Sequence, residues 1–104
     1  MELAIIIKTS QNDENEVPVK KEIKVCSSVE AAKQAVIKEL QEEFELEEEC
    51  NTYARIANEL ANSGIQSRVL GNGIIDDTIW WYNDGQGEQF DIIPMSDSED
   101  YYQI

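Results

Sequence analysis

An amphipathic helix predicted over residues 28 to 44 is the feature that most constrains the fold. Its apolar side chains recur at steps of three and four residues and form one stripe: Val29, Ala32, Val36, Leu40 and Phe44. The preceding Ser27-Ser28-Val29-Glu30 has the pattern of a capping box, in which Ser27 accepts a backbone hydrogen bond and Glu30 reaches back. A helix with one apolar stripe requires a second layer to cover that stripe.

A second helix is predicted over residues 48 to 63, ending at Gly64. Its inward-facing residues would be Tyr53, Ile56, Ala57 and Leu60. Three glutamates, residues 47 to 49, would then lie near its N-terminus, where unpaired backbone amides favour negative charge.

The remaining segments have the character of strands. Residues 2 to 9 are apolar and β-branched, residues 19 to 26 alternate, and a firm strand signal begins at Ile74. Between Gly64 and Ile74 the pattern is ambiguous: Asn72-Gly73 is either a hairpin turn after a short strand or part of a loop. We therefore expect an α+β two-layer domain in the order ββααββ, with room for one extra short strand, and a helix pair packed on one face of an antiparallel sheet. The domain would span residues 1 to 96, and residues 97 to 104 would form an acidic, frayed tail.

Four of the aromatic residues lie in the predicted hairpin of residues 78 to 93. If its turn is residues 83 to 88, Tyr82 pairs with Gln89, and the opposing pairs Trp81 with Phe90 and Ile79 with Ile92 face the core. Trp80 and Tyr82 then lie on the other face, either under another element or available to a partner, and a one-residue change of register would exchange the faces. The predicted core is Val36, Leu40, Phe44, Ile56, Leu60, Ile79, Trp81 and Phe90.

The charge is strongly negative, with 22 acidic against 8 basic residues and a formal net charge of −14. Such a surface is repelled by nucleic acid and anionic lipid and attracted to basic surfaces, so we expect no direct nucleic-acid or membrane binding. Seven glutamates and no basic residue lie between Glu39 and Glu49. Such a run is either a solvated face or a set of carboxylates that stands in for DNA phosphates.

Catalytic and metal chemistry find little support in the sequence. The chain has no His, and Asp76 and Asp77, as neighbours on a strand, point to opposite faces. The segment from Asn83 to Glu88 lacks the acidic spacing of a calcium loop. Cys26 and Cys50 are too far apart for a zinc or redox motif. We expect a non-enzymatic protein with free thiols and no cofactor or metal. We also expect it to be cytosolic, since no apolar run reaches the roughly 20 residues of a membrane span and Lys8 interrupts the apolar start.

Small size, strong acidity, exposed aromatic residues and the lack of a catalytic motif together resemble the anti-CRISPR and anti-restriction proteins that phages and mobile elements direct against host defence. The resemblance implies a stoichiometric inhibitor that binds a nuclease in the host cytoplasm, at the basic site where that nuclease holds DNA. The alternative is a regulatory or assembly module that binds a protein without DNA mimicry. The candidate partner-binding residues are Glu42, Glu43, Glu45, Glu47, Glu48, Glu49, Asp76, Asp77, Trp80, Tyr82 and Asp84.

Overall fold

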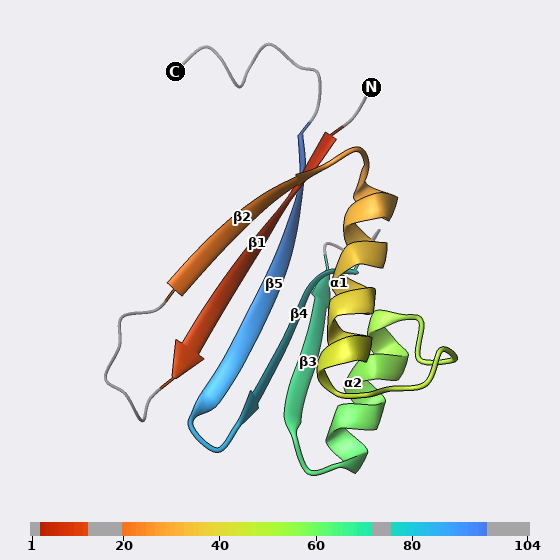
Figure 1. Ribbon diagram of the computed structural model, residues 1–104, viewed down its shortest axis with the longest axis vertical. Helices are drawn as coiled ribbons and strands as arrows, with labels where there is room; N and C mark the ends of the chain where they lie inside the picture. Colours follow the sequence, from red (N-terminus) through yellow and green to blue (C-terminus); the bar gives the residue numbers. More distant parts are fainter. Residues whose placement is uncertain (1–2, 13–19, 72–75, 96–104) are drawn as a thin grey trace.

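The computed structural model describes residues 3–12, 20–71 and 76–95. The described chain forms a five-stranded antiparallel sheet in the strand order β2-β1-β5-β4-β3, with two helices on one of its faces (Figure 1). The elements are β1 (Leu3–Asn12), β2 (Lys20–Cys26), α1 (Val29–Glu43), α2 (Tyr53–Asn62), β3 (Gln66–Gly71), β4 (Asp76–Asn83) and β5 (Gln86–Met95). This α+β architecture confirms the predicted fold class, and the ambiguous segment after Gly64 is the extra strand, β3. The proposed Asn72-Gly73 turn and the acidic tail lie outside the described residues.

The first helix begins one residue later than the predicted capping box requires. Ser28, not Ser27, is the N-cap, and its hydroxyl accepts a hydrogen bond from the Ala31 amide at 3.0 Å. With Ser28 as the cap, the third helical position is Ala31 rather than an acid, so no capping box forms. Glu30 instead accepts a hydrogen bond from Gln34 one helical turn later.

The second helix is shorter than predicted, because Thr52 is its N-cap and accepts a hydrogen bond from the Arg55 amide at 3.1 Å. Residues 47 to 49 therefore belong to the connection between the helices and not to the first turn of α2. The C-terminal prediction is confirmed: Gly64 adopts a φ of 82°, and the Ile65 amide donates to the Leu60 carbonyl at 2.9 Å. This pattern is a Schellman motif, which needs a left-handed residue at the position of Gly64.

The β4–β5 hairpin has the predicted faces but a different register. Asn83 pairs with Gln86, so the turn consists of Asp84 and Gly85, with φ values of 53° and 87°. Positive φ at both central residues is typical of a type I′ turn, for which Asp-Gly is a preferred sequence. The predicted pairing of Tyr82 with Gln89 is wrong, since Tyr82 pairs with Gly87. The shift is two residues, an even number, and therefore leaves every side chain on the predicted face.

The core lies between the helices and the face of the sheet that they cover. Both helices bury one stripe, which packs against alternating residues of β1, β4 and β5. Seven of the eight predicted core residues are buried: Val36, Leu40, Ile56, Leu60, Ile79, Trp81 and Phe90. Phe44 is only half-buried at the end of α1, where its ring meets the edge of the Trp81 ring at 5.0 Å.

Candidate functional site

The six glutamates between residues 42 and 49 are all exposed, and five of them form what we call the acidic segment: Glu42, Glu45, Glu47, Glu48 and Glu49. Glu45 has a φ of 52°, which turns the chain out of the helix. Three hydrogen bonds then hold the loop, from the Leu46 amide to the Gln41 carbonyl, from the Cys50 amide to the Glu47 carbonyl, and from the Gln41 side chain to the Cys50 carbonyl at 2.8 Å. The carboxylates therefore stand on a loop with a defined backbone.

Within the described part of the chain, none of these five carboxylates forms a salt bridge. Arg55, the first basic residue after this run in the sequence, donates to the backbone carbonyl of Glu49 at 3.0 Å rather than to a carboxylate. A side-chain hydrogen bond and the negative charge of Glu49 raise the pKa of Glu47. Such a rise is the direction expected where like charges gather without a counter-charge.

The other two glutamates of the acidic run belong to a different group, the Lys8 cluster, which consists of Lys8, Glu39, Glu43 and Glu88. The Lys8 ammonium contacts Glu39 at 2.7 Å and Glu88 at 3.1 Å. Trp81 donates its indole N–H to the other oxygen of Glu88 at 3.1 Å. The cluster ties the end of α1 to β1 and β5 on the helix-covered side of the sheet.

The pKa values of Lys8 and Glu43 in this cluster are both shifted from their ordinary values. Burial lowers the pKa of Lys8, but the hydrogen bonds to Glu39 and Glu88 outweigh it, and the pKa is raised overall. Desolvation raises the pKa of Glu43 to about 8, with further contributions from a hydrogen bond to Glu88 and from its charge. Glu43 therefore holds a proton near neutral pH, and this sets it apart from the acidic segment.

The raised pKa of Glu43 predicts a pH-dependent stability. Because the ordinary value of 4.5 rises to about 8 on folding, the native state retains a proton that the unfolded state releases. The free energy of unfolding should therefore decrease as pH rises from about 5 to about 8. The chain has no His, so few other groups titrate in this window. Urea denaturation across the window should show this slope, and Glu43→Gln should flatten it; an unchanged slope in the variant would contradict the assignment.

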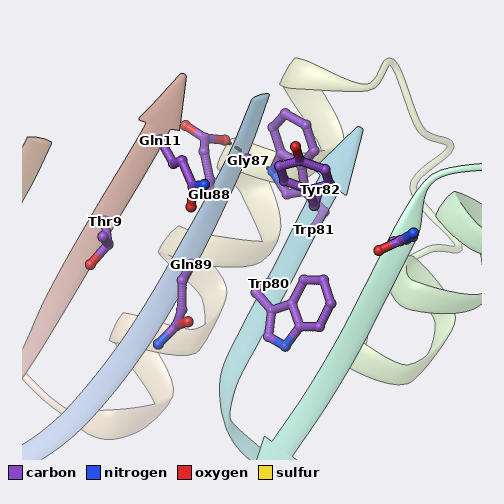
Figure 2. Close-up of a pocket in the computed structure, with 9 residues that line it drawn as sticks. Thr9, Gln11, Trp80, Trp81, Tyr82, Gly87, Glu88 and Gln89 are labelled. Carbon is purple, nitrogen blue, oxygen red and sulfur yellow. Dashed lines mark hydrogen bonds between the residues drawn. The ribbon is translucent and has the colours of Figure 1, made fainter. Parts of the chain in front are cut away.

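Trp80 and Tyr82 lie on the opposite face of the sheet from the helices. Both residues line a hollow of about 310 Å³. Figure 2 shows their side chains on the sheet, with helix ribbon behind it. Both side chains are half-buried. A Cβ on Gly87 would lie 2.8 Å from the Trp81 carbonyl oxygen and 3.0 Å from the Tyr82 ring, so only glycine fits beneath Tyr82. The other side chains around the hollow are mainly neutral and polar: Thr9, Gln11, Gln66 and Gln89.

The three aspartates predicted for the site are dispersed. Asp84 is exposed in the β4–β5 turn, whereas Asp76 and Asp77 begin β4 at the other end of the strand. Seven residues of extended chain separate Asp77 from Asp84, a distance of about 23 Å. The side chain of Asp76 lies outside the described part of the structure. The structure therefore holds five of the glutamates of residues 42 to 49 on one helix end and loop, whereas Asp77 and Asp84 lie at opposite ends of β4 and the two aromatic residues lie on the other side of the sheet.

Sequence reasoning missed the partners of Glu39 and Glu43. Lys8 follows the apolar start of β1 with the same alternation as Ala4 and Ile6, and Glu88 has the same parity as Phe90. That periodicity places both charges on the helix-covered face. An ion pair between them could have been anticipated only with the strand order, because β1 and β5 are neighbours in the sheet although far apart in the sequence.

Three further features are absent from the described residues: a metal site, paired cysteines and a membrane-spanning helix. They contain no group of three or more His, Cys, Asp or Glu residues placed to hold a metal ion. Cys26 and Cys50 are both unpaired. Neither described helix is long and apolar enough to cross a membrane.

Comparisons of the chain with protein-family models, with curated proteins and with solved structures found no match.

Proposed function

We propose that this chain is a non-enzymatic inhibitor that places its acidic segment in the basic nucleic-acid-binding site of a nuclease. The observation that carries the proposal is the set of five exposed carboxylates on an anchored helix end and loop, without a salt bridge among the described residues. A basic groove supplies the counter-charges that this segment lacks.

The acidic segment has two properties that suit a mimic of the DNA backbone. First, it gathers five carboxylates within eight residues, a dense row of negative charge like that of a DNA strand, which carries one phosphate per ~3.4 Å of helix axis. Second, the hydrogen bonds of Gln41, Leu46 and Cys50 fix the loop before any partner binds. A preformed surface loses less conformational entropy on binding than a flexible one does. The net charge of −14 adds long-range attraction to a basic target.

The proposal assigns no catalytic step to the chain. Glu43 has the raised pKa expected of a catalytic acid, but its hydrogen-bond partner is Glu88, which also holds Lys8 and Trp81. That arrangement connects α1 to the sheet and gives the carboxyl of Glu43 a structural role.

The inhibitor would act in the cytoplasm of the host cell, where an RNA-guided nuclease or restriction enzyme works.

A second candidate function is a protein-interaction module without DNA mimicry. The hollow beside Trp80 and Tyr82 favours it, because half-exposed aromatic side chains in a depression are frequent anchors in interfaces. In that case the acidic segment would serve only solubility.

Affinity capture from a host lysate tests the proposed function. The intact chain is used as bait, and bound proteins are eluted with rising salt, because contacts between exposed opposite charges weaken as salt screens them. The expected result is a nucleic-acid-binding nuclease that elutes with salt and whose cleavage activity the chain inhibits. A partner that resists salt and keeps full nuclease activity in the complex would favour the second candidate and contradict the first.

A further inference from the structure

The face of the sheet opposite the helices is apolar over β2, β1 and β5. Val25, Ile5 and Ile93 form one row across these three strands, and Ile23 pairs with Ile7 in the next row. All large hydrophobic residues that are exposed in the described chain lie on this helix-free face: Leu3 (38%), Ile23 (69%), Val25 (60%), Leu70 (48%) and Ile93 (41%). Soluble monomers rarely expose contiguous apolar patches larger than a few hundred Å². The face is therefore a candidate docking surface.

The charge of this face differs from that of the rest of the molecule. Among the described side chains, the helix-free face carries only Lys21, Arg68 and Asp91 as charged groups. The Asp91 carboxylate accepts hydrogen bonds from Thr78 at 2.7 Å and from Gln89 at 3.0 Å. By contrast, residues 29 to 62, which contain both helices, carry nine Glu against three basic residues. The molecule thus has an acidic helix layer and a nearly neutral, apolar sheet face.

We propose that the helix-free face binds a second copy of this chain, so that two sheets pack face to face about a two-fold axis. The charge distribution favours this occupant, because only this face lets two chains of charge −14 meet while their acidic layers point away from each other. Five strands at ~4.8 Å, each six to ten residues long at ~3.3 Å per residue, give a face of roughly 500 to 800 Å². A stable interface buries about 800 Å² per partner.

The dimer goes beyond the proposed function and leaves the acidic segment free on both outer surfaces. Its dependence on salt is opposite to that of the proposed nuclease complex. Repulsion between two negative chains is screened as ionic strength rises, so the dimer should become tighter between about 0.1 M and about 1 M NaCl. The nuclease complex should weaken over the same range, and the two proposals can therefore fail separately.

The test is sedimentation equilibrium of the purified chain at both salt concentrations, with variants at the two edges of one cross-strand row. Ile23 and Leu70 end the row that runs through Ile7, Asp91 and Thr78. Ile23→Glu and Leu70→Glu should each raise the dimer dissociation constant at least about tenfold, since each carboxylate enters the two-fold interface twice. Circular dichroism should be unchanged, because both side chains are exposed.

Lys24→Glu is the matched control, because Lys24 is a neighbour of Ile23 on β2 but pairs with Ile6 on the helix-covered side. It adds more negative charge than Ile23→Glu and should nevertheless leave the dimer nearly unchanged. A chain that stays monomeric at high salt would overturn the proposal. So would a dimer that Ile23→Glu disrupts and Leu70→Glu does not, since that pattern indicates pairing through the β2 edge alone.

Discussion

Reversing Glu42, Glu45, Glu47 and Glu48 to Lys should weaken binding to the captured nuclease by at least about a hundredfold. All four side chains are exposed and form no salt bridge among the described residues, so their charges are available to a partner. Even ~0.7 kcal/mol for each contact corresponds to about a hundredfold change in Kd, and the new lysines add repulsion. Titration calorimetry or fluorescence anisotropy with the captured nuclease measures the effect. Glu43 is not substituted, because its side chain forms a hydrogen bond with Glu88 in the Lys8 cluster.

A second variant separates position from net charge. Reversing Asp13, Glu14, Glu16 and Glu30 changes the net charge by the same amount but leaves the acidic segment intact. This control should bind within a few-fold of the unmodified chain. Equal losses in both variants would mean that bulk charge, and not the acidic segment, determines the affinity.

Trp81→Ala should lower the free energy of unfolding by about 3 to 5 kcal/mol, the range for removal of a large aromatic side chain from a core. Trp81 is 8% exposed, packs edge-on against Phe44 and donates its indole N–H to Glu88. The substitution therefore opens a cavity and also removes a donor from the carboxylate that holds Lys8. Because domains of this size have about 5 to 15 kcal/mol of total stability, this loss is a large share of the total. Urea denaturation followed by circular dichroism measures the loss.

The neighbouring Trp80→Ala is the control for this prediction, since Trp80 lies half-exposed on the other face of the same strand. It should lower the free energy of unfolding by about 1 kcal/mol or less. Trp81→Phe, which keeps a ring against Phe44, should fall between the two and remains measurable if Trp81→Ala does not fold. A loss for Trp80→Ala as large as that for Trp81→Ala would contradict the assignment of the two faces.

Much of the fold follows from local sequence patterns, and the errors have identifiable physical causes. The stripe from Ala32 to Leu40 predicts α1 because its period allows one buried face. The predicted cap at Ser27 is wrong because Ser28 is equally able to cap, and the spacing from Ser27 to Glu30 does not decide between the two serines. The predicted hairpin register is wrong because Asp84-Gly85 alone is enough to reverse the chain, so that the strands continue to Asn83 and from Gln86 instead of ending outside residues 83 to 88.

The candidate site was only partly accessible from the sequence. A run of glutamates can be recognised in the sequence alone. The different role of Glu43 cannot, because it depends on a hydrogen bond with Glu88, which lies on β5. Likewise, the alternation of β4 puts Trp80 and Tyr82 away from the core, but which face the helices cover depends on tertiary packing. The structure places these aromatic residues and the glutamates on opposite sides of the sheet, so one flat partner surface cannot contact both.

Competition with DNA tests the central claim most directly. Labelled duplex DNA is bound to the captured nuclease, and the chain is titrated in at about 0.1 M salt and again at a higher concentration. The account predicts that the chain displaces DNA competitively and that its affinity falls as salt rises, because the acidic segment and the phosphates use the same basic residues. Simultaneous binding of DNA and the chain, with an affinity that does not change with salt, would contradict it.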